Sequence, residues 1–182
     1  MLLRNLCAAC IVLVFISCSS SKKTASEKTN TARVRNEGTV SGKAKTFTKP
    51  LNIDRDDFVS FAKTLLGTPY KYGSANPQNG LDCSGFISHV FGHFNVKSPR
   101  SSVDFTYEGT ERSLSDAEPG DIILFTGSDN RTSTVGHMGI ITKAGRIPQF
   151  IHSASGKRVG VILNDLTGYY KVHFVKVIRI LK

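Results

Sequence analysis

Apolar residues recur at helical spacing in two stretches between residues 54 and 94. In the first stretch, which Asp54 can cap and Gly67 ends, they are Phe58, Phe61, Ala62, Leu65 and Leu66. In the second, which begins near Cys83, they are Phe86, Ile87, Val90, Phe91 and Phe94. Because residues three or four positions apart share one face of a helix, each stretch predicts an amphipathic helix. A short helix is also expected at 103–107.

From residue 121 onward the pattern changes to short apolar runs separated by gaps of turn length. The runs are 122–125, 138–142, 149–152, 161–163 and 174–181. Runs of this length, bounded by Gly, Pro and Asp, are typical of strands. Helices that come first and strands that come second favour an α+β fold, with N-terminal helices packed on an antiparallel sheet.

The first eighteen residues have the layout of an export signal. Arg4 gives a positive start, 6–16 is an apolar run too short to span a bilayer, and Ser17 and Cys18 precede a polar stretch. This resembles a bacterial lipoprotein signal, so we expect 1–17 to be the signal peptide and Cys18 to carry the lipid. An ordinary secretory signal cut nearby is the alternative. We expect an exported protein, anchored to the cell envelope on the periplasmic side of the outer membrane.

The chain has 182 residues and a formal net charge of +10, but most of that charge lies in one stretch. Residues 19–50 carry eight Lys or Arg and two Glu, whereas residues 51–182 carry fifteen Lys or Arg and twelve Asp or Glu. The polar composition of 18–50 predicts a disordered basic linker, which either lies near anionic envelope polymers or is simply soluble. The compact domain is expected at 51–182. Its small net charge argues against nucleic-acid binding, and we expect a monomer.

The cysteine count singles out one thiol. Of four cysteines, Cys7 and Cys10 leave with the signal and Cys18 is acylated, so Cys83 is the free thiol of the expected mature protein. It is either a buried structural residue or a reactive one. A helix N-terminus stabilises a thiolate and offers unpaired N–H groups to an oxyanion. Asp82 is interpreted as the cap of this helix, with a direct chemical role as the alternative.

Two histidines are placed to assist such a thiol. His137, between glycines, opens one expected strand, and His152 ends the next, so adjacent antiparallel strands can bring the two rings together. An imidazole can take a proton from a thiol, and a second polar group can orient it. The simpler interpretation of His137 is a turn residue. A zinc site of Cys83, His137 and His152 is a further alternative, although the chain has no C-x-x-C pair.

Six segments of the chain resemble the NlpC/P60 family in sequence and in order, across nearly all of 54–182. They are 67–73 (GTPYKYG), 82–86 (DCSGF), 98–101 (SPRS), 118–122 (EPGDI), 136–140 (GHMGI) and 151–153 (IHS). The resemblance implies a papain-like NlpC/P60 fold and a cysteine peptidase that cuts bacterial peptidoglycan stem peptides. The bond it implies joins γ-D-glutamate to diaminopimelate or lysine.

The same resemblance assigns roles to residues of this chain. Cys83 would be the nucleophile, His137 the base that holds it as a thiolate, and His152 the orienting partner. Tyr70 would assist the oxyanion or contact substrate, and Asp82 and Ser84 would line the cleft. No metal or organic cofactor is implied.

The sequence is also compatible with two other functions. One is a non-catalytic wall-binding lipoprotein, and the other is a related papain-like amidase or acyltransferase. His89 and His93 lie four positions apart on the second helix, a spacing that could bind a metal, but no third ligand is evident and a solvated or packed face is the preferred interpretation. His173, which begins the last expected strand, is interpreted as structural.

Overall fold

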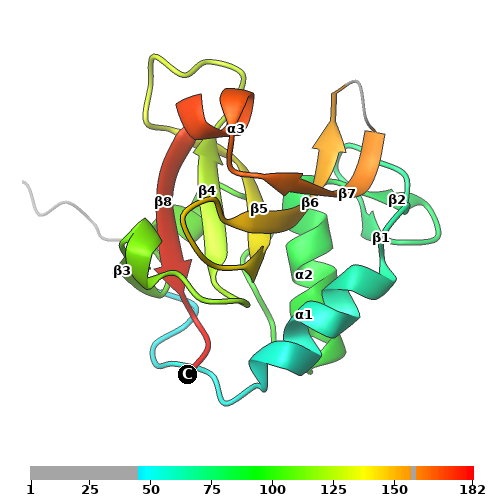
Figure 1. Ribbon diagram of the computed structural model, residues 1–182. Coiled ribbons are helices and arrows are strands. Elements are labelled where there is room, and N and C mark those ends of the chain that lie inside the picture. The colour runs from blue at the N-terminus through cyan, green and yellow to red at the C-terminus, as the bar shows by residue number, and fades with distance from the viewer. Residues whose placement is uncertain (1–44, 157–158) are drawn as a thin grey trace, which may run out of the picture. The chain divides into compact units, whose positions relative to one another are not determined.

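The computed structural model describes residues 45–156 and 159–182, so the predicted signal peptide, Cys18 and most of the predicted linker lie outside the described residues. Figure 1 shows the elements. In chain order they are α1 (Arg55–Thr64), β1 (Ala75–Asn76), β2 (Gly80–Leu81), α2 (Cys83–His93), the 3₁₀ helix η1 (Asp104–Tyr107), β3 (Thr110–Arg112), the 3₁₀ helix η2 (Leu114–Asp116), β4 (Ile122–Thr126), β5 (Val135–Lys143), β6 (Gln149–Ser155), β7 (Val159–Asp165), α3 (Gly168–Val172) and β8 (Phe174–Arg179).

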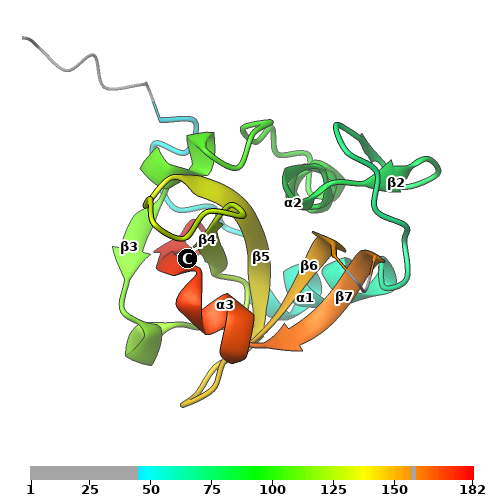
Figure 2. The ribbon, with the colours of Figure 1, turned by 90° about the horizontal axis from the view of Figure 1, so that it is seen from above.

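The larger sheet has six strands in the order β3-β8-β4-β5-β6-β7, and every neighbouring pair is antiparallel. Helices α1 and α2 lie together beside β5 and β6, whereas α3 lies apart from them (Figures 1 and 2). The α+β class and the antiparallel sheet packed on N-terminal helices are therefore confirmed.

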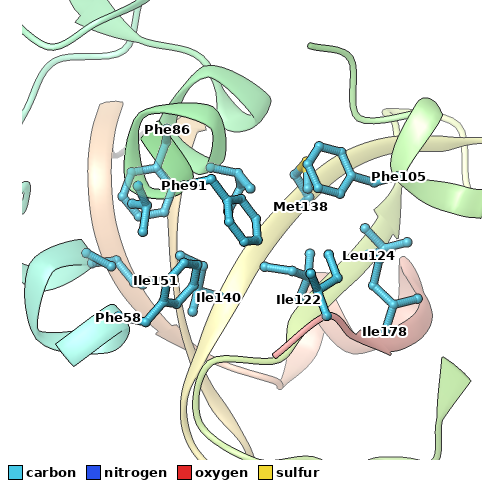
Figure 3. Close-up of a cluster of buried hydrophobic side chains, with 14 of the residues drawn as sticks. Phe58, Phe86, Phe91, Phe105, Ile122, Leu124, Met138, Ile140, Ile151 and Ile178 are labelled. Atoms are coloured by element: carbon cyan, nitrogen blue, oxygen red, sulfur yellow. The ribbon is translucent and has the colours of Figure 1, made fainter. Parts of the chain in front are cut away.

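Side chains that alternate along β4 build a hydrophobic cluster on each face of the sheet. Ile122 and Leu124 join the cluster beneath α1 and α2, and Ile123 and Phe125 join the cluster on the other face. This is the two-residue period of a strand buried on both sides. Figure 3 shows the first cluster, where phenylalanines from α1 and α2 face apolar side chains of the sheet.

The packed region begins earlier than residue 51. Phe47 is only 7% exposed, and its ring centroid lies 5.2 Å from that of Phe91 on α2. The two carboxylate oxygens of Glu108 accept hydrogen bonds from the backbone N–H groups of Thr46 and Phe47, each at 2.9 Å. Residues 46 and 47 thus belong to the domain and not to the linker in which the sequence pattern placed them.

Both long helices, the short helix near residue 104 and all five predicted strands are present. The pattern did not predict the β1–β2 hairpin, the edge strand β3 or the helix α3, which are all five residues or shorter. None of the described helices is long and apolar enough to cross a bilayer.

Candidate active site

Cys83 is the first residue of α2, and its sulfur lies near the start of β5. Asp82 is the N-cap, and its side chain accepts a hydrogen bond from the backbone N–H of Gly85 at 2.5 Å. The Cys83 Sγ lies 4.0 Å from the carbonyl oxygen of Gly136, the residue before His137. The fold therefore brings the start of α2 to the start of β5, although 53 positions separate Cys83 from Gly136.

Gly85 is required by the close packing of this helix start. An added Cβ at Gly85 would collide with the carbonyl oxygen of Ser74, and would lie 2.9 Å from Asp82 Oδ1. The same Ser74 carbonyl accepts the backbone N–H of Asp82 at 2.9 Å. The loop before β1 is thus pressed against the turn that presents Cys83, and only glycine leaves room for it.

The predicted capping role of Asp82 is confirmed, and the same carboxylate also binds an arginine. Arg100 donates to both carboxylate oxygens, from Nη1 at 3.1 Å and from Nη2 at 2.7 Å. Its Nη1 also donates to the hydroxyl of Ser84 at 3.0 Å. Because Asp82 and Ser84 are only 6% and 5% exposed, Arg100 covers a buried negative charge directly beside the thiol.

The rings of His137 and His152 are in direct contact, as the predicted strand pairing requires. His137 Nε2 lies 2.7 Å from His152 Nδ1. On its far side, His152 Nε2 lies 3.0 Å from Oδ1 of Asn164 on β7. Three side chains from three adjacent strands thus form one row of hydrogen bonds that leads away from the cleft.

Aromatic rings enclose this row. The ring centroids of Phe150 and Tyr170 lie 4.9 Å and 5.0 Å from that of His152, which is fully buried. Gly139 makes the space for it, because a Cβ there would lie 2.9 Å from the Phe150 ring and 3.1 Å from the Cβ of His152. The second histidine is therefore fixed by packing as well as by hydrogen bonds.

Cys83 and His137 both line a cleft of about 820 Å³. The remaining lining residues are Tyr70, Phe125, Thr126, Gly127, Ser128, Gly136, Ala154, Ser155, Gly156, Tyr169 and Tyr170. Tyr70 lines the same cleft as the thiol, and its side chain is hydrogen-bonded to that of Ser155. Burial, and after it the charge of Cys83, raises the pKa of Tyr70. The two tyrosines of α3 form an aromatic wall.

The cleft favours uncharged forms of both reactive groups. Burial, and after it the charge of Asp82, raises the pKa of the Cys83 thiol to about 11, although the backbone N–H groups of Ser84, Cys83 and Met138 act in the opposite direction. Burial lowers the pKa of His137 to about 3 and that of His152 to about 4. Both shifts favour the neutral thiol and the neutral imidazole, and they oppose the thiolate that the helix N-terminus favours.

The predicted site residues do not all lie in the same place. Cys83, His137 and Tyr70 line the cleft, and His152 stands behind His137. Asp82 and Ser84, predicted to line the cleft, instead lie buried beneath Arg100. No role was predicted for Asn164, Arg100 or Tyr170. The SPRS segment pointed to Arg100, whereas finding Asn164 requires the register of β6 and β7.

The other three histidines contact an aromatic ring or a hydroxyl group. His93 stacks on Phe61 with ring centroids 3.6 Å apart, and His89 lies 5.9 Å from the same ring. The Nδ1 of His173 is hydrogen-bonded to Thr126 Oγ1 at 2.8 Å. Across residues 45–156 and 159–182, no three side chains of His, Cys, Asp or Glu form a group that could hold a metal ion.

The chain is similar in sequence to bacterial hydrolases and endopeptidases. It is 33% identical over 122 residues to a γ-DL-glutamyl hydrolase of Bacillus subtilis, a match that covers 67% of this chain and 29% of that protein. It is 29% identical over 138 residues to the bifunctional muramidase/DL-endopeptidase CwlT of the same organism, covering 72% and 39%. The match thus spans well under half the length of either relative.

A solved structure and a family match agree with these relatives. The structure is the NlpC/p60 domain of the peptidoglycan hydrolase SagA, with a TM-score of 0.57, 27% identity and coverage of 69% of this chain and 98% of that domain. Residues 67–179 match the NlpC/P60 family, and this range contains Cys83, His137, His152 and Asn164. The chain belongs to the NlpC/P60 family.

Proposed function

We propose that this protein is a cysteine endopeptidase that hydrolyses peptidoglycan stem peptides. One observation carries the proposal: the thiol of Cys83, at the start of α2, shares a cleft with His137, whose ring is hydrogen-bonded to His152 behind it. A nucleophile, a base and an orienter of the base are the parts that acyl transfer through a thiol requires. The relatives named endopeptidase and hydrolase support the same reaction class.

The proposed reaction begins with an uncharged pair. As the Cys83 sulfur attacks the amide carbon, its proton passes to His137, so the C–S bond forms without a free thiolate at rest. Backbone N–H groups at the start of α2, with Tyr70 nearby, stabilise the negative oxygen of the tetrahedral intermediate. His137 then returns the proton to the leaving amine as the C–N bond breaks.

Water completes the cycle. His137 takes a proton from a water molecule as that water attacks the thioester, and the proton returns to the sulfur when the carboxylic acid product leaves. Each step uses one proton held by one imidazole, and no oxidant or cofactor is needed to balance it.

We further propose that the bond cut joins γ-D-glutamate to diaminopimelate or lysine. The printed name of one relative, a γ-DL-glutamyl hydrolase, supports a γ-glutamyl linkage, and the SagA domain supports peptidoglycan as the substrate. Tyr169 and Tyr170 give the cleft an apolar wall that suits the aliphatic part of a stem peptide.

The experiment is a digestion of purified peptidoglycan, followed by mass spectrometry of the released fragments. We expect fragments that end in γ-D-glutamate and none from Cys83→Ala, whose thermal unfolding midpoint should remain close to that of the wild type. A fragment cut at the sugar–peptide junction would identify an amidase instead. If Cys83→Ala kept the activity, the thiol would have no part in the mechanism. If the wild type bound peptidoglycan without cutting it, the protein would be a non-catalytic wall-binding protein.

The place of action is proposed from the sequence alone. We propose that Cys18 carries a lipid that holds the enzyme on the periplasmic side of the outer membrane. In cells fed radiolabelled palmitate, the wild-type protein should take up label and sediment with outer membranes, while Cys18→Ser should do neither. Equal labelling of the two proteins would rule out Cys18 as the lipid site.

A further inference from the structure

The register of β6 and β7 places Asn164 at the end of the histidine row. Phe150 pairs with Asn164 and His152 pairs with Ile162, so Asn164 is the diagonal neighbour of His152 on the same face of the sheet. Its Oδ1 lies 3.0 Å from His152 Nε2. Asn164 itself is half-buried, whereas the imidazole that it contacts is fully buried.

His152 has two side-chain hydrogen-bond partners among the described residues. These are His137 on one ring nitrogen and Asn164 on the other. Tyr170 faces it from α3, and Cys83 and Tyr70 line the cleft that His137 also lines. Since no charged side chain of the described residues bonds to His152, its neighbours decide which nitrogen carries the proton.

The position of each proton follows from the chemistry of the amide. An amide oxygen only accepts hydrogen bonds, so the proton of neutral His152 lies on Nε2 and its Nδ1 is an acceptor. The 2.7 Å contact between the two rings then requires the proton of neutral His137 to lie on Nε2. Nδ1 of His137 is left with a free lone pair, and it has no hydrogen-bond partner within the described residues.

We propose that Asn164 is a positioning residue that sets the tautomer of His137 through His152. The proposal rests on the proposed function, because it states which nitrogen of the base receives the Cys83 proton. Turning the amide over would reverse the row: the Asn164 NH₂ would donate, both imidazoles would carry their protons on Nδ1, and His137 would have no lone pair to offer the thiol. The residue therefore acts without touching the substrate.

The tautomers are measured directly by ¹⁵N NMR of the histidine-labelled full chain without substrate. In the wild type, His137 and His152 should both show the proton on Nε2. Asn164→Leu, which keeps the size of the side chain but removes the acceptor, should show a mixture of tautomers and a kcat on stem-peptide fragments that is about ten- to a hundredfold lower. Its KM should be nearly unchanged. Asp165→Ala, an exposed change at the next position of β7, is the matched control and should keep the wild-type spectrum and kcat.

Asn164→Asp separates positioning from structure. Its carboxylate keeps an acceptor at the same place, so at high pH the Nε2–H tautomers and most of the kcat should return. The added negative charge favours protonated His152, which would force the proton of His137 onto Nδ1. The acidic limb of the kcat profile should therefore move upward by about one to three pH units.

Each result bears on one proposal. A proton on Nδ1 of His137 in the wild type, or an Asn164→Leu variant with wild-type tautomers and kcat, would overturn the role of Asn164. Should Asn164→Leu fail to fold, the wild-type spectrum and the Asn164→Asp profile still decide. A wild type that cleaves no stem peptide would instead refute the proposed function, and the substrate-free spectra would be unaffected.

Discussion

Arg100 binds both carboxylate oxygens of Asp82, one position before the thiol of Cys83, at distances of 3.1 Å and 2.7 Å. The pair is asymmetric, because the Asp82 side chain is only 9% exposed and that of Arg100 is 48% exposed. The buried charge of Asp82 raises the pKa of the thiol, after the larger effect of burial itself. Arg100 thus compensates a negative charge that opposes ionisation of Cys83.

We therefore expect Arg100→Ala to slow alkylation of Cys83. Without the guanidinium, the Asp82 charge acts on the sulfur with less compensation, so the thiol pKa rises further and less thiolate is present at a given pH. The measurement is the rate of iodoacetamide labelling between pH 7 and 10, which should shift toward higher pH. Arg131→Ala is the matched control, since Arg131 forms a similar pair with Asp129 on an exposed loop. Equal shifts in the two variants would refute a local effect.

Two glycines of α2 should respond to alanine in opposite directions. At Gly85 the added methyl group would collide with the Ser74 carbonyl, so Gly85→Ala should lower the free energy of unfolding by about 1–3 kcal/mol and disturb the presentation of Cys83. At Gly92 an added Cβ would have no atom within 4 Å, so Gly92→Ala should raise stability by up to about 1 kcal/mol through helix propensity. Urea denaturation measures both, and a stabilised Gly85→Ala would show that the two segments are not in close contact.

The helices, the strands and the candidate catalytic residues could be predicted from local sequence patterns. Residues such as Phe58 and Phe86 bury one face of a helix, so their spacing alone predicts the helices and the layer that covers the sheet. Cys83, His137 and His152 were candidates because few residue types can act as nucleophile or base at neutral pH, and the resemblance of six segments to one family then assigned their roles. The contact between His137 and His152 follows from the pairing of neighbouring antiparallel strands, which a short gap between two strands predicts.

The rest depends on tertiary relations that no local pattern carries. Asn164 contacts His152 only because of the register between β6 and β7, and Phe47 is one apolar residue in a polar stretch without any period. The resting ionisation of Cys83 is a balance between burial and the helix N-terminus, and the degree of burial is known only from the folded structure.

Acid should destabilise the protein through the buried histidine pair. Burial lowers the pKa of His152 from 6.5 to about 4 and that of His137 to about 3. At a pH between these values and 6.5, the unfolded chain therefore binds more protons than the folded chain. Their contribution to stability is complete above about pH 6.5 and is lost as the pH falls toward 4, by up to about 1.4 kcal/mol per pH unit for each histidine. Urea denaturation at several pH values measures this slope.

The matched variants for that slope are two glutamine substitutions. His152→Gln removes one buried titrating group and should flatten the slope between pH 6.5 and 4. Lys63→Gln, at an exposed position of α1, should leave it as in the wild type. A wild type whose stability is constant across this range would contradict the burial of a neutral pair.

Residues 46 and 47, which lead into the domain, should contribute measurably to its stability. Phe47 packs against Phe91 and Phe105, so Phe47→Ala should cost about 3 kcal/mol of unfolding free energy. Glu108→Gln keeps one acceptor but leaves a second backbone N–H without its carboxylate partner, which should cost about 1–3 kcal/mol. Glu111→Gln, in an exposed pair with Lys176, should change stability by no more than about 0.5 kcal/mol.

A double-mutant cycle tests whether Phe47 and Glu108 hold the same segment. If the carboxylate fixes the backbone that presents the ring, either change alone releases residues 46 and 47, and the two costs should add to more than the cost of the double variant. Urea denaturation of the full chain and the three variants gives the coupling energy. Strictly additive costs would mean that the ring stays in the core without the carboxylate, and that Glu108 does not fix the entry of the chain.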